Sequence, residues 1–271
     1  MTKMDAWNPA QYGKFGAERA RPFEDLLALV DPAPDGRRIE HAIDLGCGTG
    51  ALTARLHEHL GGADTVGVDS SAAMLEDARP LERAGLRFEL GDIAAFEARG
   101  EFDLVFSNAA LHWVPDHPGL LRRLRDALRP GGQLAVQVPT NGDHPSHTLA
   151  FEIAHEEPFR AALRDRGDAL AEATPVVAPE RYADLLDELG FVEQHVRVQV
   201  YGHHLASTAD VVEWTKGTTL TRFERGLTPE MYVEFVDRYR RRLLDLLGDR
   251  SPYFYTFKRV LFWGKVPAGQ R

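Results

Sequence analysis

The sequence has one cysteine, no long apolar run and no excess of basic residues. A single cysteine in 271 residues excludes an internal disulfide, so we expect a reducing compartment, the cytoplasm. No segment approaches the ~20 apolar residues that cross a bilayer, and the first residues lack the pattern of a secretory signal. The net charge of -9 argues against a nucleic-acid partner, which requires a basic face.

The one cysteine, Cys47, lies in the glycine-rich segment Asp44-Leu45-Gly46-Cys47-Gly48-Thr49-Gly50. No histidine or other base adjoins it, so we interpret it as a small residue tolerated in a turn and not as a nucleophile. His144, His147 and His155 match no common zinc spacing, and no cysteine joins them. We therefore expect no metal site.

Apolar segments alternate with helical segments over the first half of the chain. The expected strands are 39–45, 64–69, 86–90, 102–107 and 133–138. The expected helices between them include 51–60, 71–79 and 120–128, and Pro130-Gly131-Gly132 is expected to end the last of them. This alternation predicts parallel βαβ crossovers in an α/β, doubly wound, Rossmann-like sheet.

After Pro139 the pattern becomes mainly helical, with a long alternating strand from Phe191 and an aromatic strand at 253–263. The later helical blocks lie between strands, so we read them as insertions and not as a separate domain. We therefore expect one domain, 1–271. Its parts would be an N-terminal helical lid, a cofactor-binding core and two helical cap insertions, at 1–30, 30–139, 140–190 and 207–250.

The glycine-rich segment closes one expected strand and opens an expected helix. Glycines there let the backbone turn sharply and approach a ligand, and the following helix presents unpaired N–H groups. Three acids, Asp44, Asp69 and Asp92, follow the ends of the first three expected strands. In an open parallel sheet, that edge binds ligands, and an acid about twenty residues past the glycines binds ribose hydroxyls. Each acid could instead cap the next helix.

The glycines alone leave the cofactor open. Gly46-x-Gly48-x-x-Ala51 also fits the dinucleotide fingerprint, so a nicotinamide cofactor and S-adenosylmethionine are both compatible with it. The segments around it add the distinctive pattern: Val68-Asp69-Ser70-Ser71-x-x-Met74-Leu75, Gly91-Asp92-Ile93, Phe102 to Trp113, and Leu128-Arg129-Pro130-Gly131-Gly132. Together they resemble a class I S-adenosylmethionine-dependent methyltransferase over about residues 39–139. Such a fold implies a seven-stranded sheet with an antiparallel last strand.

This resemblance implies a role for each cofactor residue. Asp44 would favour the ammonium group, Asp69 the ribose hydroxyls and Asp92 the adenine amino group. The other residues expected at the cofactor are Tyr12, Arg21, Gly46, Gly48, Gly50, Ser70, Met74, Ile93 and Asn108. Asn108 would lie beside the sulfonium.

Over nearly its whole length, the chain also resembles the trans-aconitate 2-methyltransferase family. The likeness rests on Trp7-Asn8-Pro9-x-x-Tyr12-x-x-Phe15, His112 to His117, Glu213-Trp214-x-x-Gly217-Thr218-x-Leu220-x-Arg222 and Phe257-x-Arg259-x-x-Phe262-Trp263. It implies methyl transfer to a carboxylate of a small anionic acid. Carboxylates are already nucleophilic at neutral pH, so alignment would supply most of the catalysis.

The acceptor must be held by cations and hydrogen-bond donors within an acidic chain. His112 is the catalytic candidate, although some members of the family carry Gln there. The expected acceptor-binding residues are Arg19, Trp113, Tyr201, His203, Arg222 and Arg259. Each arginine could instead be a surface residue, and His112 could be a packed histidine.

Three other functions remain compatible with the sequence. The protein could methylate another small metabolite, bind S-adenosylmethionine without catalysis, or act as a nicotinamide oxidoreductase. We expect a small-molecule partner and a monomer or weak dimer.

Overall fold

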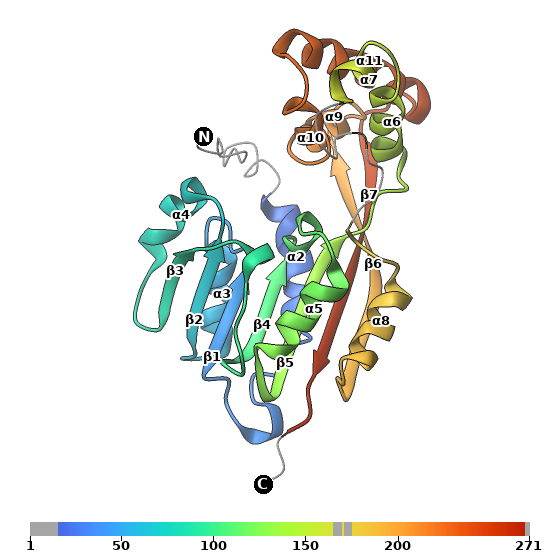
Figure 1. The fold of residues 1–271 in the computed structure, drawn as a ribbon. Coiled ribbons are helices and arrows are strands. Elements are labelled where there is room, and N and C mark those ends of the chain that lie inside the picture. Colours follow the sequence, from blue (N-terminus) through green and yellow to red (C-terminus); the bar gives the residue numbers. More distant parts are fainter. Residues whose placement is uncertain (1–15, 165–169, 171–174, 269–271) are drawn as a thin grey trace. The chain divides into compact units, whose positions relative to one another are not determined.

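The computed structural model describes residues 16–164, 170 and 175–268, and Figure 1 traces their fold. They form two compact units. The first takes its described residues from Met1–Pro139, Pro175–Gln199 and Arg259–Arg271, and the second from Thr140–Thr174 and Val200–Lys258. Tyr12 lies outside the described residues, as do the first 15 residues of the expected N-terminal lid.

A seven-stranded sheet has the order β3-β2-β1-β4-β5-β7-β6. Its strands are β1 (His41–Leu45), β2 (Asp64–Asp69), β3 (Leu86–Leu90), β4 (Phe102–Asn108), β5 (Leu128–Pro139), β6 (Glu193–Leu205) and β7 (Tyr253–Lys265). The first five strands pair in parallel, and β7 runs antiparallel to β5. This confirms the predicted doubly wound methyltransferase sheet with its antiparallel last strand.

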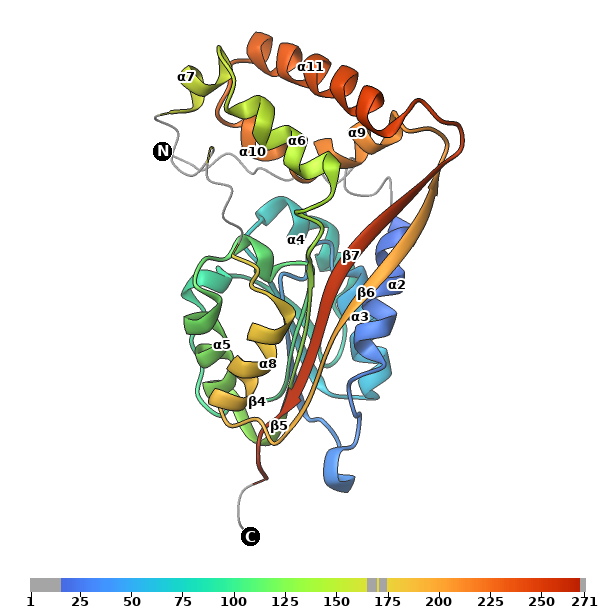
Figure 2. The ribbon, with the colours of Figure 1, turned by 90° about the vertical axis from the view of Figure 1, so that its right-hand side faces the viewer.

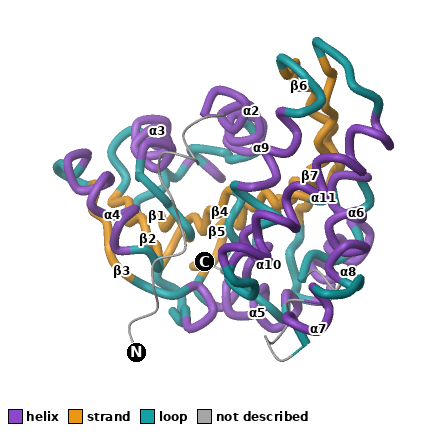
Figure 3. The backbone as a smooth tube through the Cα atoms, turned by 90° about the horizontal axis from the view of Figure 1, so that it is seen from above, coloured by secondary structure: helices purple, strands orange, loops and turns teal. Residues whose placement is uncertain are grey.

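Helices cover both faces of the sheet in the first unit (Figures 2 and 3). On one face, α2 (Gly16–Leu27) and α3 (Ala51–Leu60) pack through Phe23, Leu26 and Leu56 onto Phe106. On the other face, α5 (His117–Asp126) and α8 (Pro179–Glu188) bury Leu120 and Tyr182. Beside β3, α4 (Ala72–Ala78) completes the unit. The apolar periodicity that predicted the first-half helices reflects these contacts.

The segment Pro130-Gly131-Gly132 was expected to end a helix, but it lies inside a strand. Helix α5 already ends at Asp126, and β5 begins at Leu128. The register between β4 and β5 slips between Phe102 and Leu104, so these three residues form an irregularity at the start of β5. A regular ladder resumes at Gln133 and runs to Gln137.

The second unit is a helical cluster with an aromatic core. It contains α6 (Pro145–Ala154), α7 (Phe159–Leu163), α9 (Asp210–Lys216), α10 (Thr221–Glu224) and α11 (Pro229–Leu247). Phe223 packs on Phe151 and Phe235, with ring centroids 5.5 and 5.0 Å away. Residues 175–190, the last part of the first expected insertion, belong to the first unit, where α8 packs on the sheet.

Candidate active site

The glycine-rich turn connects β1 to α3 at the carboxyl edge of the sheet. The N–H groups of Gly46 and Cys47 donate to the carbonyl of Val68 on β2, at 2.7 and 3.1 Å. Gly46 has φ +83, and a Cβ there would lie 2.1 Å from the Cβ of Ala110. Gly48 has φ +55 and open space where a Cβ would stand. Gly46 therefore permits packing within the protein, whereas Gly48 leaves room for a ligand.

Asp69, at the end of β2, organises this turn. Its Oδ2 accepts from the N–H of Gly48 and its Oδ1 from the N–H of Ser71, both at 2.9 Å. The N-cap of α4 is Ser71, whose Oγ accepts from the N–H of Met74 at 3.2 Å. Asp69 is therefore not the N-cap of that helix. It is a half-buried carboxylate whose orientation is fixed by two backbone donors.

Asp44 is buried, with 4% of its surface exposed, and its Oδ2 accepts from the hydroxyl of Thr53 on α3 at 2.6 Å. The pKa of Asp44 is raised to about 7, chiefly by burial; the nearby Asp69 also raises it, and the Thr53 hydrogen bond opposes the shift. A cation beside this group would favour its ionised form. Burial, followed by Asp44 and Asp69, also raises the pKa of Cys47, so its thiol stays protonated and is not a nucleophile.

Several other predicted cofactor residues of the first unit lie after β2 and β3 and at the end of β4. Ser70 is exposed, and Met74 is a buried residue of α4. Asp92 is exposed and accepts from the N–H of Ala94 at 2.9 Å, so it does act as a cap, for the short 3₁₀ turn Ile93–Ala95. Asn108 ends β4, and its buried Oδ1 has no hydrogen-bond partner among the described residues.

Four polar side chains share one face of the sheet. Asp44 is paired with Phe106, two residues before Asn108, and Asn108 is paired with Gln137. Pro139, two residues after Gln137, is paired with Arg259. Because registered residues and i, i+2 neighbours point to the same face, this row crosses β1, β4, β5 and β7. Its charge changes from acidic at Asp44, through two amides, to basic at Arg259.

Arg259 is a buried arginine, 6% exposed, and its Nη1 donates to Oε1 of Gln137 at 3.1 Å. Gln137 has no exposed surface. Sequence analysis identified Arg259 but missed Gln137. An alternating position in an apolar strand, Val136-Gln137-Val138, was the only available signal.

His112 lies in the 3₁₀ turn Leu111–Trp113 that follows β4. Its pKa is lowered to about 3, chiefly by burial and then by the charges of Arg259 and His117. The imidazole is therefore neutral at physiological pH. Its buried Nδ1 has no hydrogen-bond partner within the part of the chain that the structure describes. Trp113, 45% exposed, lies beside it with ring centroids 4.6 Å apart.

Three predicted acceptor residues belong to the second unit. Tyr201 and His203 are buried, and the His203 ring lies 5.0 Å from that of Trp214. The guanidinium of Arg222 lies 5.3 Å from the centre of the Phe151 ring. From the N-terminal segment, Arg21 is an exposed residue of α2, and only the helical backbone is described at Arg19.

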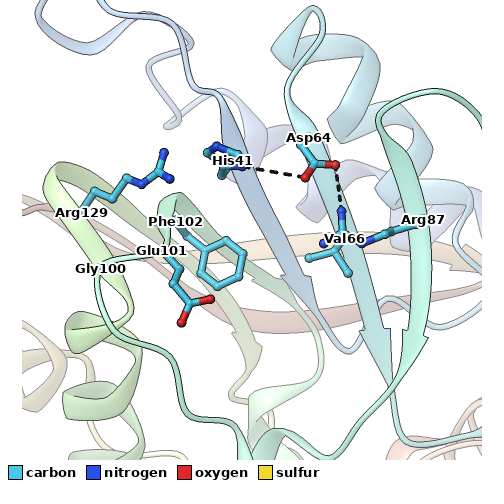
Figure 4. A pocket seen from close by; sticks show the side chains of 8 residues that line it. All are labelled: His41, Asp64, Val66, Arg87, Gly100, Glu101, Phe102 and Arg129. Atoms are coloured by element: carbon cyan, nitrogen blue, oxygen red, sulfur yellow. Dashed lines mark hydrogen bonds and ion pairs between the residues drawn. The ribbon is translucent and has the colours of Figure 1, made fainter.

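A pocket of about 290 Å³ lies at the opposite edge of the sheet (Figure 4). His41, Asp64 and Phe102, at the amino ends of three strands, line it, and Arg87 pairs with Asp64 at 2.8 Å. It contains none of the predicted site residues. Since open parallel sheets bind ligands at the carboxyl edge, the polar row is the better candidate site.

Among the described residues, no three histidine, cysteine, aspartate or glutamate side chains gather as metal ligands would. Within the same ranges, every helix is too short or too polar to cross a membrane.

Solved structures share the fold at low sequence identity. The YcgJ protein of Bacillus subtilis superposes with a TM-score of 0.57 at 14% identity, covering 92% of this chain and 100% of that one. The phosphoethanolamine N-methyltransferase 2 of Haemonchus contortus, solved with S-adenosyl-L-methionine, gives a TM-score of 0.53 at 18% identity. It covers 95% of this chain and 57% of the other.

Sequence relatives are much closer. Residues 38–189 match the family model of a methyltransferase domain. The trans-aconitate 2-methyltransferase of Deinococcus radiodurans is 45% identical, over 96% of this chain and 98% of its own. The enzyme of that name from Variovorax paradoxus is 40% identical, over 88% of each chain. The chain therefore belongs to the trans-aconitate 2-methyltransferase family.

Proposed function

We propose that this protein transfers the methyl group of S-adenosylmethionine to a carboxylate of trans-aconitate, giving a monomethyl ester. The observation that carries the proposal is the row of polar side chains from Asp44 to Arg259, acidic at one end and basic at the other. The donor carries an ammonium and a sulfonium group, and the acceptor is an anion. A charge gradient along one edge suits both partners.

The acidic end fits the donor. Asp44 would bind the ammonium group, which would offset the burial that disfavours its charged form. Asp69 would accept from the ribose hydroxyls while its turn is held by Gly48 and Ser71. Asp92 would accept from the adenine amino group, and Ile93 would pack against the ring. The buried Oδ1 of Asn108, which has no hydrogen-bond partner among the described residues, would face the sulfonium end.

The basic end fits a carboxylate. When bound, S-adenosylmethionine supplies an electrophilic methyl group on a sulfonium. Arg259 would bind the acceptor anion and fix its direction. His112, neutral because of its low pKa, would form a hydrogen bond at the acceptor site without transferring a proton. The nucleophile needs no general base, so alignment of the partners can supply up to ~7–11 kcal/mol of the barrier reduction.

The remaining predicted acceptor residues lie outside the polar row. We propose that Tyr201, His203 and Arg222 supply hydrogen-bond donors to the acceptor, and that Arg19 and Trp113 also contact it. Tyr12, Arg21, Ser70 and Met74 would contact the donor. We propose further that the protein works in the cytoplasm as a monomer or weak dimer.

A methyl-transfer assay with labelled S-adenosylmethionine tests the reaction. The panel would contain trans-aconitate, cis-aconitate, citrate, propane-1,2,3-tricarboxylate and uncharged alcohols and phenols. We expect base-labile label, typical of a methyl ester, with trans-aconitate and little with the uncharged acceptors. Label on a phenol alone would support a different O-methyltransferase. Binding of S-adenosylhomocysteine without any transfer would support a non-catalytic binding protein.

A further inference from the structure

Gln137 is held from both sides at the centre of the polar row. On β5 it is paired with Asn108 of β4 and with Leu261 of β7. Its backbone carbonyl accepts from the N–H of Ala109 at 2.9 Å. The side chain is fully buried, so its amide has few alternative orientations.

The two ends of this amide have different environments. Oε1 accepts from the guanidinium of Arg259 at 3.1 Å. Nε2 has no hydrogen-bond partner among the residues that the structure describes. A buried N–H donor without a partner costs free energy, so such a group in a native protein calls for an explanation. A bound anion beside Arg259 would provide the missing acceptor.

An amide at this position also preserves the charge of its neighbour. A glutamate would offer the same oxygen to Arg259, but it would neutralise the guanidinium and repel an incoming carboxylate. An amide orients the guanidinium without placing a negative charge beside it. Glutamine can therefore orient Arg259 without neutralising it.

We infer that Gln137 is a positioning residue for the acceptor: Oε1 holds the guanidinium of Arg259, and Nε2 donates to the same acceptor carboxylate. The inference rests on the proposed function, because it takes a small polycarboxylate as the acceptor. It assigns part of the selectivity for anions to a neutral side chain. Orientation of Arg259 should then affect acceptor affinity more than it affects the methyl-transfer step.

The decisive variant is Gln137→Glu, which keeps the length of the side chain and the acceptor for Arg259. We expect the KM for trans-aconitate to rise about 30-fold or more, because a buried charge now opposes the anion. The kcat should change less than about threefold, since the transfer step itself is untouched. The Kd of trans-aconitate for enzyme saturated with S-adenosylhomocysteine, measured by calorimetry, should rise with the KM.

A second variant and a control distinguish the loss of acceptor positioning from a loss of stability. Gln137→Met removes both polar ends without adding charge and should raise the acceptor KM about tenfold. The control is Gln133→Glu on the same strand, because Gln133 is equally buried but bonded to Trp263 and Asp31, at 2.8 and 3.0 Å. It should lower thermal stability and leave the acceptor KM within about twofold of wild type.

The inference is overturned if Gln137→Glu keeps the wild-type KM and Kd for trans-aconitate. It is also overturned if the KM for S-adenosylmethionine rises by the same factor as the KM for trans-aconitate. If Gln137→Glu no longer binds S-adenosylhomocysteine, the KM and Kd of trans-aconitate are measured on Gln137→Met, and unchanged values there overturn the inference. Failure of the proposed function is a distinct result: wild type would then transfer methyl to none of the carboxylic acids.

Discussion

The two ends of the polar row are built in different ways. At the acidic end, Asp69 is hydrogen-bonded to backbone N–H groups of Gly48 and Ser71, 21 and 2 residues away in the chain. At the basic end, the bond between Gln137 and Arg259 joins residues 122 positions apart. The acidic end therefore forms from two segments that are close in the chain, β1 with its turn and α3, and β2 with α4. The basic end exists only once β5 and β7 have paired.

The two ends also differ in how completely their polar groups are satisfied. Asp44 and Asp69 accept from Thr53, Gly48 and Ser71 within the protein. Near the basic end, His112 Nδ1 and Gln137 Nε2 are buried without hydrogen-bond partners among the described residues. The acidic end is thus preformed for its ligand, whereas the basic end has bonding capacity that a bound anion would use.

The largest expected effect is at the acidic end. Asp69→Ala should weaken binding of S-adenosylhomocysteine about 300-fold, because two ribose hydroxyls lose a charged acceptor and the Gly48 turn loses its partner. Calorimetry measures the change, with Asp92→Ala as a control of smaller effect, since Asp92 is exposed. Unchanged affinity in Asp69→Ala would remove this residue from the cofactor site.

A substitution at the basic end should have a comparable effect, but on binding of the acceptor alone. Arg259→Met should raise the KM for trans-aconitate about 100-fold, because the principal cation of the row is lost. The KM for S-adenosylmethionine should change less than about threefold. Arg197→Met is the matched control, since Arg197 is a partly buried arginine bonded to the carbonyl of Asp25 at 3.2 Å. A similar rise in both KM values would contradict the division between the two ends.

The pH dependence of cofactor binding is the next largest effect. Because the folded-state pKa of Asp44 is raised from 3.8 to about 7, the folded protein keeps a proton there that the unfolded chain has lost. This acid therefore lowers stability as pH rises through that window. An ammonium ligand prefers the ionised form, so affinity for S-adenosylhomocysteine should fall about 50-fold from pH 7 to pH 5.

Two measurements check this linkage. Titrations in buffers of different ionisation enthalpy should detect a proton released on binding near pH 6. Asp44→Asn should bind more weakly at pH 7 and lose the dependence, because no proton remains to be released. A pH-independent affinity in the wild type would mean that the ammonium group lies elsewhere.

The comparison also explains what the sequence could predict. The glycine turn, the three acids and the alternating strands are local patterns, and the structure confirms the sheet that they imply. Gln137 could not be recognised, because its significance depends on Arg259 and on an antiparallel pairing across 122 residues. The Pro130-Gly131-Gly132 segment was misread as a helix end for a related reason. Its role depends on the slipped register with β4.

A substitution of Arg222 tests whether this predicted acceptor residue binds the anion. Arg222→Ala should raise the acceptor KM about tenfold if its guanidinium contacts the anion, with little change for the cofactor. Arg238→Ala is the matched control, because Arg238 also lies over a phenylalanine ring of the second unit, Phe159, at 4.8 Å. It should cost stability through its bonds to Glu156 and Glu234 and leave acceptor affinity unchanged. Equal KM effects on both substrates would exclude Arg222 from the acceptor site.

The smallest effect should come from His112. Since its pKa lies near 3, the imidazole acts as a neutral hydrogen-bonding group, a role that a glutamine amide can also fill. His112→Gln should therefore reduce kcat/KM only about threefold, whereas His112→Ala should reduce it about 30-fold. The profile of kcat against pH should show no ionisation between pH 5 and 9 that disappears in His112→Gln. If one did disappear, His112 would be a proton-transfer group, and methyl transfer to a carboxylate, which needs no base, would not explain its role.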